Sequence, residues 1–101
     1  MATSKQTWLQ FGIGNLTSTA VTVAYTGTQG RTAKLPVGIY RVTVTTDAHL
    51  LQGTVAATAA ATDTYLAAGE SIDIEVGTGT EYVSAIQATA GGDLFCTLLA
   101  G

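Results

Sequence analysis

The sequence predicts an all-β protein, a single small sandwich of about eight strands. Three observations predict this fold. Hydrophobic side chains alternate with polar ones along most of the chain, the alternating stretches are rich in Val, Ile, Thr and Tyr, and turn residues separate them. The length of 101 residues is near the commonest size of one domain. We expect a jelly roll, with an immunoglobulin-like sandwich as the alternative.

Alternation is clearest in residues 20–25, 39–45 and 71–76. Each stretch places aliphatic or aromatic side chains on one face and mostly threonine or charged side chains on the other. This pattern is typical of a strand with one buried and one solvated face. The expected buried sets are Val21, Val23 and Tyr25; Tyr40, Val42 and Val44; and Ile72, Ile74 and Val76.

Weaker alternation supplies the remaining strands, and glycine-containing turns separate them. The expected ranges are residues 7–11, 32–35, 50–56, 64–66, 82–88 and 93–99. The pair Gly91-Gly92 favours a tight hairpin between the last two strands. Residues 55–62 are rich in alanine but lack a helical apolar stripe, so we expect a loop there, with a helix as the lesser alternative. The predicted organisation is an N-terminal arm over residues 1–6 and one β-sandwich domain over residues 7–101.

The composition excludes several classes of protein. Charged residues make up 11% of the chain, against about 25% in an ordinary globular domain. With four Lys and Arg residues and a net charge of −3, the chain cannot neutralise a row of phosphates, so we expect no nucleic-acid partner. No apolar run reaches the length of about 18 residues that a membrane helix needs. The N-terminus shows no secretory signal, and the single cysteine, Cys96, fits synthesis in a reducing cytosol.

Residues able to carry chemistry are few and do not form a known catalytic pattern. Asp47 and His49 could form an orienting pair, but a polar turn is the simpler interpretation. Asp73 and Glu75 project from one strand face, where carboxylates are usually only solvated. Gly12-Ile13-Gly14 lacks the third glycine of a dinucleotide fingerprint. We therefore expect a protein that is not an enzyme, with no cofactor, no metal and no small-molecule substrate.

The aromatic residues leave one alternative open. Trp8, Phe11 and the tyrosines could form a platform for stacking sugars, which would make the chain a carbohydrate-binding β-sandwich. Aromatic side chains serve equally well in a core or in a protein interface. The sequence does not distinguish these uses.

The second half of the chain resembles a known class of proteins. Residues 38–43 (Gly-Ile-Tyr-Arg-Val-Thr), 61–70 (Ala-Thr-Asp-Thr-Tyr-Leu-Ala-Ala-Gly-Glu), 83–88 (Val-Ser-Ala-Ile-Gln-Ala) and 91–97 (Gly-Gly-Asp-Leu-Phe-Cys-Thr) are similar to small virion proteins of tailed bacteriophages, of the capsid decoration (cement) type. The resemblance implies a non-enzymatic protein, made in the host cytoplasm, on the capsid surface. It implies contacts with the major capsid protein and with copies of itself as a homotrimer. A head fibre, a neck or tail accessory or a host-surface-binding module is the alternative.

Two regions are our predicted protein interfaces. The first runs from Ala2 to Trp8, over the N-terminal arm and the start of the domain, where Thr3, Lys5 and Trp8 could extend across a neighbour. The second is the loop over residues 54–64, where the small side chains of Ala57, Ala59 and Ala60 allow close approach. Cys96 lies in a predicted strand, and we expect it to be buried and inert.

Overall fold

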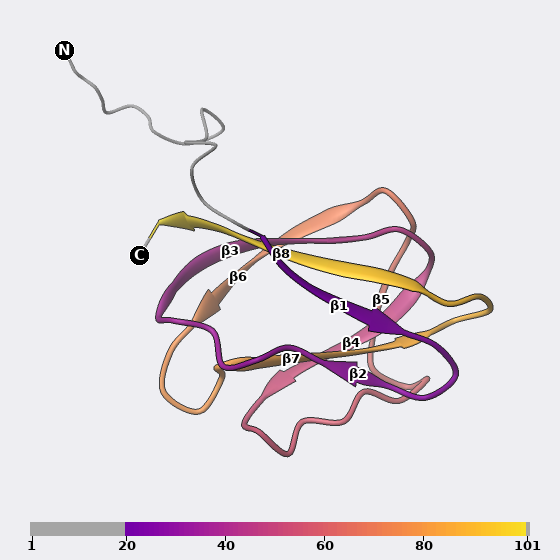
Figure 1. Cartoon of the computed structure of the whole chain (residues 1–101), viewed down its shortest axis with the longest axis horizontal. Coiled ribbons are helices and arrows are strands. Elements are labelled where there is room, and N and C mark those ends of the chain that lie inside the picture. The colour runs from indigo at the N-terminus through magenta and orange to yellow at the C-terminus, as the bar shows by residue number, and fades with distance from the viewer. Residues whose placement is uncertain (1–19, 101) are drawn as a thin grey trace, which may run out of the picture.

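A computed structural model describes residues 20–100 of the chain (Figure 1). These residues contain eight β-strands and no helix. The strands are β1 (Val21–Tyr25), β2 (Gly30–Arg31), β3 (Gly38–Val44), β4 (Ala48–Gly53), β5 (Thr64–Leu66), β6 (Ser71–Val76), β7 (Tyr82–Gln87) and β8 (Gly92–Ala100). The all-β prediction is confirmed, and residues 54–63 form a loop as expected.

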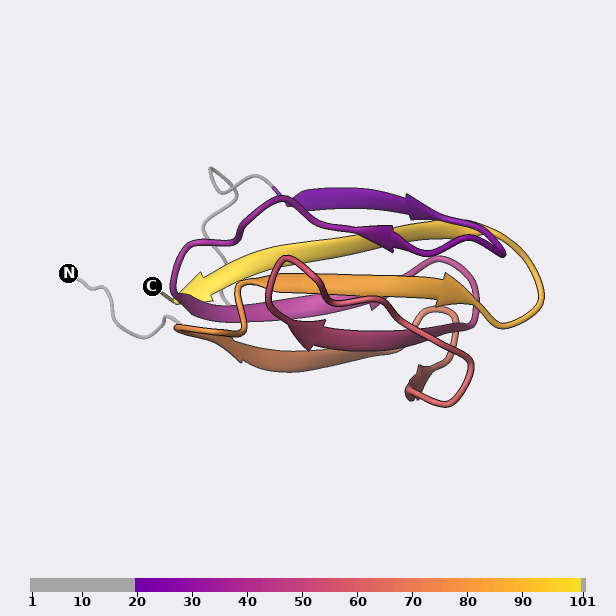
Figure 2. The ribbon, with the colours of Figure 1, turned by 90° about the horizontal axis from the view of Figure 1, so that it is seen from below.

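The strands form two antiparallel sheets of four. One has the order β1-β8-β3-β6 and the other the order β2-β7-β4-β5. The sheets lie one above the other in Figure 1, and Figure 2 shows the strands running along the long direction of the molecule. Inward side chains of both sheets fill the space between the layers, as in other β-sandwiches.

The pairing follows a nested scheme. The first strand pairs with the eighth, the second with the seventh, the third with the sixth and the fourth with the fifth. Additional pairing of β3 with β8 and of β4 with β7 rolls this long hairpin into two sheets. This arrangement of eight strands is a jelly roll, so the first expectation is confirmed over the immunoglobulin-like alternative.

Two local expectations are wrong. The pair Gly91-Gly92 does not close a hairpin, because β7 and β8 belong to different sheets and the segment between them crosses from one to the other. The strand expected at residues 32–35 is instead the short β2, which ends at Arg31. Thr32 explains this end: its backbone N–H donates to the Val83 carbonyl, but its side-chain Oγ1, not its own carbonyl, accepts the Val83 N–H at 3.1 Å.

The core lies between the sheets and is built from the predicted inward residues. Val42, Val44, Val76, Leu94 and Cys96 are all at most 1% exposed. The hydroxyl groups of two buried tyrosines reach backbone acceptors at the rim: Tyr25 donates to the Thr46 carbonyl and Tyr40 to the Pro36 carbonyl, each at 2.7 Å. These bonds let aromatic rings fill the core without leaving a buried hydroxyl unpaired.

Candidate functional site

The acidic and histidine side chains singled out from the sequence do not assemble into a catalytic group. His49 Nδ1 lies 3.1 Å from the Asp63 carbonyl, not beside a carboxylate. The backbone N–H of Ala68 donates to Asp47 Oδ1 at 2.8 Å, and this bond is the main reason that the pKa of Asp47 lies below its ordinary value. Among residues 20–100, no three His, Cys, Asp or Glu side chains are placed to hold a metal ion.

Asp73 and Glu75, the other acidic residues singled out from the sequence, also have different surroundings. Arg41 on β3 donates from Nε to Asp73 on β6 at 2.9 Å, and this contact lowers the pKa of Asp73. Glu75, two residues further on, makes no hydrogen bond through its carboxylate to any residue in the described part of the chain. Both members of the Arg41–Asp73 pair are about half exposed, and exposed pairs of this kind contribute little to stability.

The contact loop was predicted over residues 54–64; the observed loop covers residues 54–63, because β5 begins at Thr64. It folds back over the outer face of the β2-β7-β4-β5 sheet. Arg31 on β2 donates to the Ala57 carbonyl at 2.8 Å. The Ser84 hydroxyl on β7 accepts the Ala59 N–H at 2.9 Å and donates to the side chain of Gln29. Ser84 is fully buried although it points away from the core, because the loop covers it.

Three of the six predicted interface residues lie in the part of the chain that the structure describes, and they differ in exposure. Ala57 and Ala59 are 7% and 3% exposed and face their own sheet, whereas Ala60 is exposed. Thr3, Lys5 and Trp8, together with the rest of the predicted arm and the strand expected at residues 7–11, lie outside the described residues. Of the six, only Ala60 is therefore seen with its side chain at the surface.

The loop attachment predicts a measurable effect at Ser84. We expect Ser84→Val to destabilise the protein by about 2 kcal/mol, because it leaves the buried Ala59 N–H without an acceptor. The matched control is Ser71→Val on β6, where the serine is exposed and β-branched residues are favoured. Urea unfolding of both variants measures the difference. Equal stabilities would show that the Ser84 hydroxyl does not hold the loop.

Four large hydrophobic side chains that the interface prediction missed are exposed in the described part of the chain. They are Val37 (68%), Ile39 (44%), Val55 (59%) and Tyr65 (53%). Tyr65 packs against His49 on the neighbouring strand, with ring centroids 5.5 Å apart. Alternation around Leu66 already indicates that Tyr65 faces outward, but nothing local shows whether that face is covered.

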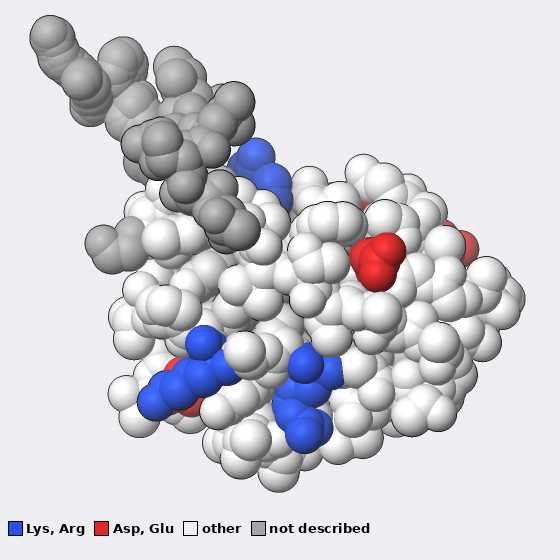
Figure 3. All heavy atoms as spheres, in the orientation of Figure 1, with Lys and Arg blue, Asp and Glu red and all other residues white. Residues whose placement is uncertain are grey.

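Uncharged surface dominates the exterior. On the outer face of the β1-β8-β3-β6 sheet, Thr22, Phe95, Thr43 and Ser71 lie side by side in one row across the four strands. Figure 3 shows the same character from one side: a few isolated charged side chains stand in a wide uncharged area. Threonine takes the outward positions where lysine or glutamate usually stands.

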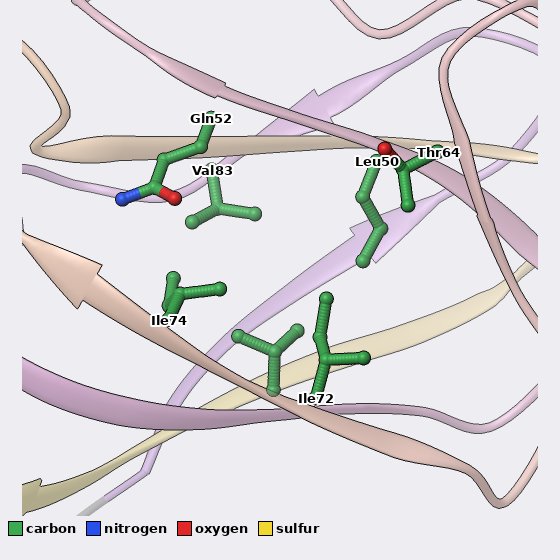
Figure 4. Close-up of a pocket in the computed structure, with 7 residues that line it drawn as sticks. Leu50, Gln52, Thr64, Ile72, Ile74 and Val83 are labelled. Atoms are coloured by element: carbon green, nitrogen blue, oxygen red, sulfur yellow. The ribbon is translucent and has the colours of Figure 1, made fainter.

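One pocket opens between the sheets at the side where β5 and β6 are the edge strands (Figure 4). Its volume is about 160 Å³. Ile72 and Ile74 of β6 point across it toward Leu50 and Val83 of the opposite sheet. The full lining is Val42, Leu50, Gln52, Thr64, Ile72, Ile74 and Val83.

Comparison with known proteins finds no relative. No family model matches the sequence, and neither curated proteins nor solved structures give a significant match. The part of the chain that the structure describes contains no helix long and apolar enough to cross a membrane.

Proposed function

We propose that this chain is a non-enzymatic structural protein of a bacteriophage virion, a decoration protein that binds and stabilises the lattice of the major capsid protein. In this proposal the chain is made in the host cytoplasm and ends on the capsid surface. Its partners are the major capsid protein and further copies of itself, arranged as a homotrimer. The fold agrees with this role by analogy, since jelly rolls recur in viral capsid proteins.

The observation that carries the proposal is the charge-poor exterior. Only 11% of the residues are charged, and Val37, Ile39 and Val55 expose large aliphatic side chains. Burying an unpaired charge against a neighbour is costly, so the centres of protein interfaces are depleted of charge. A small domain that packs against shell subunits gains from such a surface, whereas a free monomer gains solubility from more charge.

Copy number in purified particles tests the proposal. Mass spectrometry of virions from the source phage should find this chain in stoichiometric amounts with the major capsid protein. Particles made without the gene should lose their DNA at lower temperature, because each decoration contact opposes the internal pressure. A handful of copies per particle would instead favour a neck or tail accessory or a head fibre. Absence of the chain from particles would overturn the proposal.

Glycan binding is the second candidate, and the surroundings of Tyr65 favour it. The ring is half exposed beside His49, and the nearby Asp47 carboxylate raises the pKa of its hydroxyl. An exposed ring next to a polar acceptor can stack on a sugar and bond its hydroxyl groups. A glycan array in which Tyr65→Ala removes a signal given by the natural chain would support this candidate over the virion proposal.

A further inference from the structure

The two sides of the sandwich are closed differently. At one side β1 and β2 lie close together, and a methyl group at Gly30 would collide with the Ala24 carbonyl oxygen. At the other side β5 has only three residues and pairs only with Ala48–Leu50 of β4. The pocket opens at this second side, and β6 forms its rim.

Within residues 20–100, β6 has no strand partner along this rim. The backbone carbonyl of Val44 accepts a hydrogen bond from the Gly69 N–H on the side of β6. The N–H of the next residue, Thr45, donates to the Asp93 carbonyl on the side of β8. Every second residue of a strand directs its backbone N–H and C=O groups to the same neighbouring strand. Like Val44, Val42 and Tyr40 therefore bond toward β6, where their paired residues are Ile72 and Ile74.

It follows that the intervening residues of β6 turn their backbone groups outward. The Glu75 carbonyl confirms this orientation, because it accepts a bond from Gln52 Nε2 at 2.8 Å, from outside the β3–β6 pair. Ser71 and Asp73 share the parity of Glu75 along the strand. Their N–H and C=O groups therefore face the free edge.

The edge and the pocket lie next to each other, so one extended chain can use both. Added beside β6, such a chain would turn alternate side chains toward the pocket and the others toward the outer face. A cavity of about 150 Å³ holds a benzene molecule, so the volume of about 160 Å³ here suits one leucine-sized side chain. On the outer face the same chain would lie beside Glu75 and beside Asp73, which already binds Arg41 of β3.

We propose that the free edge of β6 binds an extended segment of a partner protein in which an aliphatic side chain stands between lysine or arginine residues. The aliphatic side chain fills the pocket, and the backbone pairs with Ser71 and Asp73. The basic side chains face the Glu75 carboxylate and compete with Arg41 for Asp73. This is strand addition to a sheet edge. The inference is independent of the virion proposal, because it concerns only the chemistry of this edge.

A second copy of this chain is a poorer occupant of the same edge. Two β6 strands paired about a twofold axis would place Asp73 and Glu75 of one copy opposite those of the other. Like charges directly across a strand pair are destabilising, and charged residues on edge strands are a common protection against such pairing.

Three short capped peptides test the proposal by NMR titration of the isotope-labelled full chain. The first alternates lysine with threonine and has one central leucine at a threonine position. The second replaces the leucine by threonine, and the third exchanges the leucine with its lysine neighbour. We expect the first to shift the amide signals of Ser71, Asp73 and Glu75 and the methyl signals of Ile72 and Ile74. The other two should bind about tenfold more weakly, the effect of leaving one aliphatic side chain unburied.

Variants of the chain separate backbone pairing from charge. Asp73→Pro removes an N–H that faces the free edge, a position where edge strands tolerate proline, and should abolish binding. Asp73→Ala keeps the N–H and should retain most of it. Should Asp73→Pro fail to fold, Thr64→Leu at the exposed pocket mouth serves instead, because the larger side chain fills the pocket. Equal affinity for the three peptides, shifts confined to other strands, or a dimer of the chain through β6 would overturn the proposal.

Discussion

Leu94→Ala should lower the free energy of unfolding by about 3 to 4 kcal/mol. Leu94 is fully buried on β8, the strand that joins β1 to β3. Its paired neighbours are Val23 on β1 and Val44 on β3, and both belong to the central packing. Both neighbouring strands are held by hydrogen bonds, so the surroundings cannot collapse fully into the space that the leucine leaves. The lost burial and the remaining cavity therefore add.

Ile39→Ala is the matched control, because it removes the same number of carbon atoms from the neighbouring strand β3. Ile39 is 44% exposed and faces away from the core. Its replacement should cost about 1 kcal/mol or less, since much of its area is already in water. Chemical denaturation of both variants gives the comparison. A loss at Leu94 no larger than at Ile39 would mean that the two sheets are not packed through β8.

Cys96 should be almost unreactive in the folded chain. The residue is fully buried between β1 and β3, and burial raises the pKa of its thiol from 9.0 to about 11. The thiolate is the reactive form, so a shift of this size alone slows labelling about a hundredfold. A disulfide reagent at pH 8 should modify native protein at least that much more slowly than protein unfolded in urea. Rapid native labelling would contradict the burial of the thiol.

The same shift makes the fold less stable at alkaline pH. The unfolded thiol ionises at lower pH than the buried one, so the unfolded state loses its proton first as the pH rises. Stability is therefore complete below about pH 9 and falls as the pH approaches 11, by up to about 2 kcal/mol from this group. Burial also raises the pKa of Tyr40, and its contribution has the same sign.

The variant Cys96→Ala separates the contribution of the thiol to the loss of stability at alkaline pH from that of Tyr40. The variant should be less stable than the natural chain at pH 8, because it removes buried atoms. That difference should shrink as the pH is raised to 10.5, because only the natural chain has the thiol to ionise. The part of the Tyr40 pKa shift that comes from burial remains in both proteins, whereas the smaller part caused by the Cys96 thiolate is lost with the cysteine. Parallel stability curves for the two proteins over this range would contradict the assignment to Cys96.

Much of the fold follows from short-range patterns in the sequence. Alternation identified the inward residues of β1, β3 and β6. Cys96 was expected to be buried because it lies in a predicted strand and free cysteines usually are buried. On β7 the pattern fails, because Val83, Ser84 and Ala85 are all buried in succession. Ser84 is covered from outside by the 54–63 loop, and the attachment of that loop through Ala59 and Arg31 joins parts of the chain far apart in sequence.

The candidate sites were less predictable than the strands. Asp47 and His49 are two residues apart in sequence, yet the Asp47 carboxylate accepts the Ala68 N–H and His49 Nδ1 bonds to the Asp63 carbonyl. The pocket beside β6 brings together five strands, including residues as far apart as Val42 and Val83. No local pattern carries that information.

The low charge of the chain, the strand-forming stretches and the buried face of each alternating strand were determined by the sequence alone. These are properties of side chains and of a repeat of two residues, and they need no partner. The tertiary structure decided which strands pair, that Gly91-Gly92 crosses between sheets, and that one side of the sandwich stays open. Pairing joins segments distant in the chain, so its outcome depends on how all eight strands share one core.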